Sequence, residues 1–194
     1  SDGGRKWNVL GNWLRDPESS SSDNPYVLYA QGTDGRIHVL ATESHPRNRP
    51  NSIYHGYIEG GLLHDSTGTV LSALADRPVS VDELTMVWAS DGLARAWGSS
   101  MIVQEGGRVV VAFSVRDADQ EYSYWWGELD EGTWRTRRVA DAGDPFYQAE
   151  NDYTGLVALD PRQPDRMVIS TNVRPESGEP LISSADGLQH WELF

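Results

Sequence analysis

The stretch SSMIVQEGGRVVVAFSVRDADQEYSYWWGELDEGTWRTRRV, residues 99–139, decides the fold of this 194-residue chain. Its apolar residues recur with a period of two in short runs, and Gly, Asp and other polar residues separate the runs. This pattern predicts β-strands joined by turns. We place the strands at Ser99 to Gln104, Arg108 to Val115, Tyr122 to Glu128 and Thr133 to Val139. Together they form one four-stranded antiparallel unit.

Two further groups of short runs repeat this unit along the chain. One covers Tyr26 to Gln31, Arg36 to Thr42, Ser52 to Ile58 and a strand near Leu62, and the other covers Gly155 to Leu159, Arg166 to Thr171 and Gln189 to Phe194. We read Ser72 to Leu84 as a loop with a short helical turn, and Glu18 to Asn24 as a flexible surface loop. Four strands in about forty residues correspond to one propeller blade.

The sequence therefore predicts an all-β fold, a β-propeller of four-stranded antiparallel blades. We expect a single partial domain over residues 1–194, with the end of one blade at 1–16 and blades at 25–71, 97–140 and 153–194. Three to four blades are fewer than a propeller normally needs to close. We expect the remaining blades of the same protein, or a second copy, to complete the ring.

Asp-box turns support the repeat interpretation. Asp2-Gly3-Gly4-Arg5-Lys6-Trp7 fits D-x-G-x-x-W, a hairpin turn capped by its own Asp and locked by Trp, and a degenerate copy runs from Ser184 to Trp191. Such turns are structural and carry no chemistry. They indicate architecture only.

Composition excludes several classes of function. A formal net charge of −13 argues against a nucleic-acid partner, which requires clustered Lys and Arg. The absence of Cys excludes disulfides and thiolate metal sites. No run approaches the roughly 20 apolar residues of a membrane helix, so we expect no membrane partner. The 8 Trp and 8 Tyr suit either repeat cores or sugar-stacking platforms.

The densest cluster of reactive side chains is HPRNRPNSIYHGY, which runs from His45 to Tyr57. In a strand, His55 and Tyr57 point to one face and Tyr54 to the other. His45, with Arg47 and Arg49, would lie in the preceding loop. The simpler alternative is that these side chains only hydrogen-bond the backbone of a wide turn.

Paired His and Tyr beside Arg suit β-elimination from a uronate. Arg neutralises the carboxylate, His or Tyr takes the α-proton, and a second group protonates the leaving oxygen. A metal site built from His45, His55 and His64 lacks the close spacing of strong motifs, so we predict no metal and no cofactor. Hydrolysis needs two carboxylates, but loop acids such as Asp117 and Asp119 are more simply read as solvated turn charges.

At these residues the sequence resembles the BNR-repeat (Asp-box) propeller proteins of bacteria, a neuraminidase-like family that includes ulvan-type polysaccharide lyases. The resemblance rests on three motifs: His45-Pro46-Arg47-Asn48 with Pro50-Asn51-Ser52-Ile53-Tyr54-His55, Tyr153-Thr154-Gly155 with Ala158-Leu159-Asp160-Pro161, and Ile169-Ser170-Thr171. It implies a sialidase-like propeller in a secreted or periplasmic protein.

The resemblance also implies site residues. It points to His45 and His55 as catalytic groups, with Tyr122 or Tyr124 as the catalytic Tyr by placement. The Arg that neutralises the uronate in such lyases would be Arg137 or Arg138. Together with these two, we assign Arg47, Arg49 and Tyr57 to substrate binding. True sialidases additionally need three Arg, a Tyr/Glu pair and an Asp acid, and no sequence motif identifies the pair.

Our leading hypothesis is a carbohydrate-active propeller that cleaves an acidic, uronate-containing polysaccharide or oligosaccharide by β-elimination. The alternatives are a non-catalytic glycan-binding or scaffold propeller and a sialidase-like hydrolase. The net charge of −13 opposes an anionic substrate at long range. The hypothesis therefore requires local positive potential from Arg47, Arg49 and Arg137.

Overall fold

The computed structural model describes residues 5–6, 9, 11–16, 24–145, 157–171 and 173, and the backbone of 189–193. Both Asp-box aspartates, Asp2 and Asp186, and residues 18–23 of the predicted surface loop lie outside this part. The described residues form strands and a single 3-10 helix, η1. The strands are β1 (Leu14–Arg15), β2 (Val27–Gln31), β3 (Ile37–Ala41), β4 (Ile53–Glu59), β5 (Leu62–Asp65), β6 (Val70–Ala73), β7 (Val79–Ser80), β8 (Thr85–Trp88), β9 (Arg95–Val103), β10 (Val109–Arg116), β11 (Tyr122–Asp130), β12 (Thr133–Asp141), β13 (Val157–Leu159), β14 (Met167–Thr171) and β15 (Gln189–Leu193).

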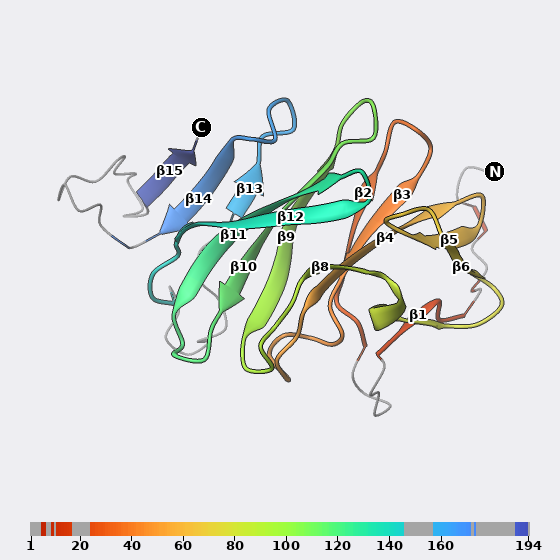
Figure 1. Ribbon diagram of the computed structural model, residues 1–194, viewed down its shortest axis with the longest axis horizontal. Helices are drawn as coiled ribbons and strands as arrows, with labels where there is room; N and C mark the ends of the chain where they lie inside the picture. The colour runs from red at the N-terminus through yellow and green to blue at the C-terminus, as the bar shows by residue number, and fades with distance from the viewer. Residues whose placement is uncertain are drawn as a thin grey trace.

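Three antiparallel sheets fan out side by side without closing into a barrel (Figure 1). The first blade has the order β2-β3-β4-β5-β6, with β8 also pairing with β4. The second blade has the order β9-β10-β11-β12, and the third consists of β13-β14-β15. A short parallel pair, β1 with β7, lies outside these sheets. The fold is all-β, as predicted, and consistent with an incomplete propeller.

The strands of residues 99–139 form the second blade, as the alternation predicts. Its core strand, β10, buries seven of its eight residues because both faces are covered by neighbouring sheets. The structure adds four strands that the pattern did not reveal: β1, β6, β7 and β8. The predicted helical turn between residues 72 and 84 is present as η1 (Val81–Glu83).

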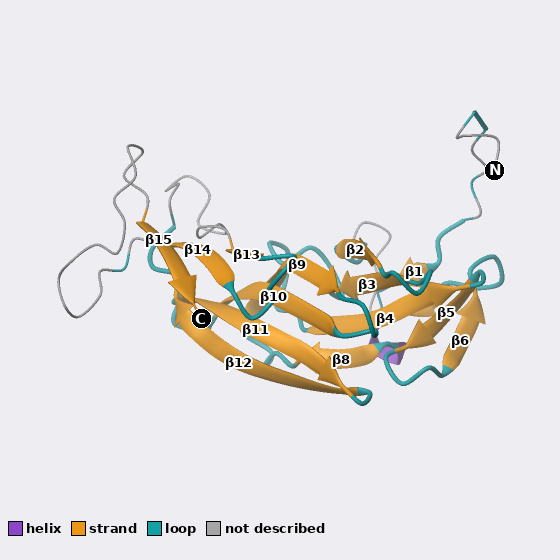
Figure 2. Ribbon diagram, turned by 90° about the horizontal axis from the view of Figure 1, so that it is seen from above, coloured by secondary structure: helices purple, strands orange, loops and turns teal. Residues whose placement is uncertain are grey.

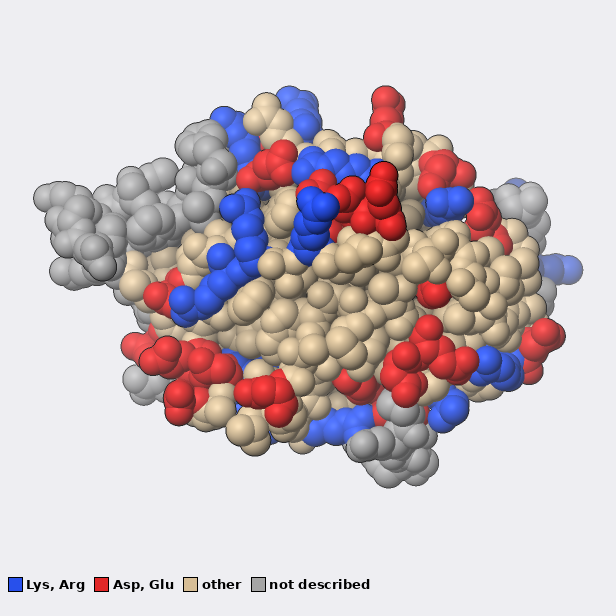
Figure 3. Space-filling view, viewed as in Figure 1, with Lys and Arg blue, Asp and Glu red and all other residues tan. Residues whose placement is uncertain are grey.

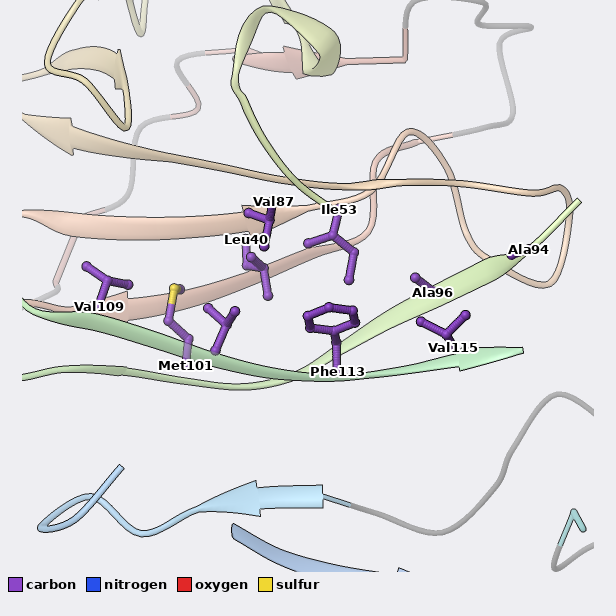
Figure 4. Packing of buried hydrophobic residues seen from close by; sticks show 10 residues of the cluster. Leu40, Ile53, Val87, Ala94, Ala96, Met101, Val109, Phe113 and Val115 are labelled. Carbon is purple, nitrogen blue, oxygen red and sulfur yellow. The ribbon is translucent and has the colours of Figure 1, made fainter. Parts of the chain in front are cut away.

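The blades pack face to face through apolar side chains. Between the first and second blades, Leu40 and Ile53 meet Met101, Phe113 and Val115 (Figure 4). On the opposite face of the second blade, another cluster joins it to the third blade. Full burial of a side chain such as Phe113 contributes about 3 kcal/mol. The seams between blades therefore hold the sheets in position.

The two ends of the strands differ. The upper edge of Figure 1 holds turns such as those between β2 and β3 and between β9 and β10, whereas the lower edge, which we call the loop end, holds the eleven-residue connection between β3 and β4. The loop end contains residues 42–52, 89–94 and 117–121. The first strand of each blade packs against the next, β2 against β9 and β9 against β13. Seen from above, these strands lie along one side of the molecule and β12 lies on the other (Figure 2).

Aspartates cap many of the turns. The side chains of Asp34, Asp65, Asp91, Asp117 and Asp160 each accept backbone N–H groups from residues two to four positions later. This is the turn-forming chemistry of Asp. Asp117, considered above as a loop carboxylate, is therefore occupied in holding its own turn.

Charged side chains gather toward the ends of the strands, and the middle of the face in Figure 3 is largely uncharged. Among the residues that the structure describes, no helix has the length and apolar character needed to cross a membrane.

Candidate functional site

His45 lies at the loop end, in the connection between β3 and β4. Its Nδ1 accepts the backbone N–H of Arg47 at 3.1 Å, and its ring packs edge-on against Tyr26 with centroids 5.0 Å apart. Because Nδ1 acts as an acceptor, we assign the proton of the neutral ring to Nε2. His45 can therefore present an N–H donor from a half-buried position.

The two arginines of the His45 loop have different surroundings. Arg49 forms an ion pair with Asp16, which is 1 % exposed, and its Nε donates to Ser44 Oγ at 3.1 Å. This pair ties residues 11–16 to the loop. Arg47 is exposed, and its carbonyl oxygen accepts a hydrogen bond of 2.6 Å from Arg95.

Arg95 connects this loop to the second blade. Its guanidinium also lies 3.3 Å from the carbonyl oxygen of Pro46. Arg95 is paired in register with Arg116 across β9 and β10, and Arg116 with Tyr122 across β10 and β11. Directly paired residues share one face of a sheet. Since neighbouring strands are about 4.8 Å apart, the backbones of Arg95 and Tyr122 lie about 10 Å apart.

Tyr122 and Arg138 line a groove of about 700 Å³ at the loop end. The remaining charged residues of this groove are acidic: Asp119, Glu121, Asp141 and Asp144. Arg138 is ion-paired with Asp141. The groove therefore brings two predicted site residues together, but its acids outnumber its single cation.

His55 occupies a different environment, the seam between the first two blades. It is fully buried, with Nδ1 2.7 Å from Ser66 Oγ and Nε2 3.1 Å from His38 Nδ1. Trp134 of β12 donates its indole N–H to the same Ser66 oxygen at 3.1 Å and packs edge-on against the His55 ring. The chain Trp134–Ser66–His55–His38 thus crosses the seam.

One arrangement of protons satisfies most of this chain. Ser66 donates to the His55 carbonyl oxygen at 3.3 Å and accepts from Trp134 and from His55 Nδ1–H. His55 Nε2 then accepts from His38 Nδ1–H, and His38 Nε2, which is buried and has no hydrogen-bond partner, remains an unprotonated acceptor. An unpaired acceptor costs less than an unpaired N–H donor.

Both rings are held neutral. Burial lowers the pKa of His55 to about 3, and repulsion from His38 adds to this effect. Burial also lowers the pKa of His38, which Asp34 partly opposes. Tyr57 lies beside this pair, with its ring stacked on His64 at 4.7 Å and the Arg36 guanidinium 4.4 Å from its centroid.

Two further predicted residues lie elsewhere in the second blade. Tyr124 is 0 % exposed and donates its hydroxyl to the Ser170 carbonyl oxygen at 2.7 Å, toward the third blade. Arg137 is exposed on β12, with its guanidinium 5.1 Å from the ring centroid of Trp126.

The structure thus brings His45, Arg47 and Arg49 together at the loop end, and Tyr122 and Arg138 in one groove at the same end. It does not bring His55, Tyr57, Tyr124 or Arg137 to that place. Within the described residues, no group of three or more His, Cys, Asp or Glu side chains could hold a metal ion.

Sequence reasoning missed two features of this end. Arg95 escaped notice because the predicted strand began at Ser99, four residues after the start of β9 at Arg95. A Tyr/Glu pair also exists: Tyr54 donates to Glu43 Oε1 at 2.8 Å. Burial raises the pKa of Tyr54 and keeps it protonated, and the Ser52 N–H donates to the other oxygen of Glu43 at 2.7 Å. This pair ties the loop to β4.

Comparison with known proteins supplies the family. No curated protein matches the chain. A family model described as "BNR repeat-containing family member" matches residues 1–142. The match covers most of the chain and includes the first two blades with the His45 loop. The chain therefore belongs to the BNR repeat-containing family.

Proposed function

We propose that this protein is a carbohydrate-active propeller that binds an acidic, uronate-containing polysaccharide at its loop end and cleaves it by β-elimination. The observation that carries the proposal is the contact of Arg95 with the carbonyl oxygens of Pro46 and Arg47. It joins the His45 loop of the first blade to the row of Arg95, Arg116 and Tyr122 on the second.

These side chains match the needs of the reaction. Arg47, Arg95 and the Nε2–H of His45 neutralise the uronate carboxylate, which makes the adjacent C5 proton more acidic. A base removes that proton, a double bond forms between C4 and C5, and the C4–O bond breaks with protonation of the leaving oxygen. Tyr122 is the predicted catalytic hydroxyl at this end. Because His45 Nδ1 is already an acceptor for Arg47, His45 acts as a donor.

The loop end also bears on the objection from net charge. The groove at Tyr122 is acidic, so the proposal places the positive potential at the His45 loop, where Arg47 and Arg95 lie. Arg137, on β12, does not contribute to it. Because the field of the whole protein is negative, attraction of the substrate acts at short range, within about 10 Å at ordinary salt.

The test is an elimination assay on uronate polysaccharides, followed by absorbance at about 235 nm, where an unsaturated uronate product absorbs. His45→Asn is the informative variant, because the Asn side chain can still accept the N–H two residues later while the imidazole is lost. We expect its rate to fall about 100-fold or more. Arg135→Gln, an exposed arginine on β12 outside the proposed site, is the matched control and should retain full activity.

A glycan-binding propeller without catalysis is the second candidate. It is favoured by the burial of His55 and Tyr124, whose polar atoms are engaged within the protein. Binding of uronate polysaccharides without any rise in absorbance would select this function. Release of a reducing sugar without the unsaturated product would instead indicate a hydrolase.

A further inference from the structure

A groove of about 280 Å³ lies beside β2, between its start and residues 11–14. Trp13 and Tyr29 contribute aromatic rings to it, and Asn12 and Asn24 contribute amides. The residues that line it carry no formal charge, in contrast to the loop end. Its volume is near the lower limit of about 300 Å³ for ligand sites, which suits one small ring rather than a long chain.

The aromatic side chains of this groove are at least partly exposed to solvent. Tyr29 is 52 % exposed, and its ring lies 6.2 Å from that of Trp13 at an angle of 51°. The Trp13 carbonyl oxygen accepts the Val79 N–H at 2.9 Å, next to the β1–β7 pair. The main chain at Trp13 is therefore anchored to β7, which fixes the position from which its side chain projects.

The chemistry of these side chains selects a sugar. Tyr and Trp rings offer an apolar face with a polar edge, which matches the C–H face of a pyranose. Each Asn amide both donates and accepts hydrogen bonds, as a sugar hydroxyl requires. Among the described residues that line the groove there is no charged side chain. This favours a neutral sugar over a uronate, because a carboxylate would find no cation among these residues.

The groove also adjoins the candidate site. Pro25 lines it, and the next residue, Tyr26, packs its ring against His45 with centroids 5.0 Å apart. The Tyr26 carbonyl oxygen accepts the Thr42 N–H at 3.0 Å, at the start of the His45 loop. A glycan that places a uronate at the His45 loop can therefore extend toward Trp13 and Tyr29.

We infer that the Trp13–Tyr29 groove is a sugar-binding subsite for a neutral pyranose unit of the same polysaccharide whose uronate binds at the loop end. This inference rests on the proposed function for the orientation of the bound polysaccharide. Recognition of a neutral sugar by the groove does not itself depend on the uronate carboxylate. The subsite makes the preferred ligand one in which a neutral sugar lies near a uronate.

Calorimetric titration of the full chain with two matched probes tests this inference. One probe is a hexasaccharide that alternates uronate with neutral sugar, and the other is the same hexasaccharide with its carboxylates reduced to alcohols. Tyr29→Ala should weaken binding of both probes by about threefold to tenfold, the range for one aromatic contact. Tyr29→Phe, which keeps the ring, should bind nearly as wild type. Met86→Ala, an equally exposed apolar residue on β8, is the control and should change nothing.

Arg47→Gln separates the inference from the proposed function. It should weaken the acidic probe and leave the reduced probe unchanged. If Tyr29→Ala binds both probes as wild type does, or if the wild-type chain does not bind the reduced probe, the subsite is refuted while the loop-end proposal stands. If only Arg47→Gln is without effect, the loop-end proposal fails and the subsite stands.

Discussion

His45 and His55 lie ten positions apart in one reactive segment, yet the structure gives them opposite environments. His45 sits in a loop at the strand ends, half-buried, with Nε2 as a donor. His55 is fully buried in the seam between two blades, where its pKa falls to about 3. A histidine in a loop is available for ligands, whereas one on the inner face of a strand serves packing and hydrogen bonding between sheets. The predictions below test this division.

His55→Ala should produce the largest loss of stability. The change opens a cavity at a fully buried position and removes partners of Ser66 and His38. We expect the free energy of unfolding to fall by about 3 kcal/mol, measured by urea denaturation monitored by tryptophan fluorescence. A loss below about 0.5 kcal/mol would mean that the seam does not depend on this ring.

Acidification should destabilise the protein through the same pair. In the unfolded chain His55 titrates near pH 6.5, and in the folded protein its pKa is about 3. The unfolded state therefore binds more protons below pH 6.5. The stability from this group is fully present above that pH and is lost as the pH falls toward 3.

This loss should approach about 1.4 kcal/mol per pH unit, or about 2 kcal/mol between pH 6.5 and 5. Urea denaturation at several pH values between 5 and 7, above the titration of ordinary carboxylates, measures the slope. In His55→Ala the slope should be smaller by the contribution of His55. Equal slopes in the two proteins would show that burial in the seam does not lower the pKa of His55.

Trp134→Phe should have a smaller effect on the seam. An aromatic ring is kept, although it is smaller than the indole, and the N–H that donates to Ser66 is removed. We expect a loss of about 1 kcal/mol in the free energy of unfolding, the usual net contribution of one hydrogen bond. Trp88→Phe is a suitable comparison, because Trp88 packs in the same seam against Phe113 and Trp125. A larger loss in Trp88→Phe would show that the Ser66 hydrogen bond is not the relevant contact.

His45→Asn should have the smallest effect on stability, within about 0.5 kcal/mol. Within the described residues, its ring contacts the half-exposed Tyr26 and its own loop. Thermal unfolding of this variant beside His55→Ala measures the contrast between the two positions directly. A large destabilisation by His45→Asn would indicate that the loop is a structural element of the blade.

Much of the fold could be predicted from alternation alone. The second blade alternates with period two and is bounded by turns with Gly and Asp, so its four strands were found, although not all of their ends. The strand β8 was not predicted, because its pairing with β4 interrupts the order of the blade and is set by a contact distant in sequence. The start of β9 was placed too late for the same reason: Arg95 and Ala96 are recognised as strand residues only through their pairing with β10.

The candidate site was less predictable. The sequence places His45, Arg47 and Arg49 in one loop, and their short separation along the chain keeps them near each other. It gives no information about Arg95, which reaches them from a strand that begins 46 residues later than Arg49. Tyr122 and Tyr124 looked equivalent, and both are buried. They differ in position, because Tyr122 lines the loop-end groove whereas the Tyr124 hydroxyl donates to Ser170 of β14.

The sequence by itself determined the all-β repeat, the turn positions and the segment that holds the reactive side chains, because alternation and turn chemistry are local properties of the chain. Only the tertiary structure decided which of those side chains face solvent. That outcome depends on how neighbouring blades cover each sheet face, and residues far apart in sequence set it. His55 is buried because Trp134 of the next blade covers it, and His45 stays at the loop end because its loop extends beyond the seam.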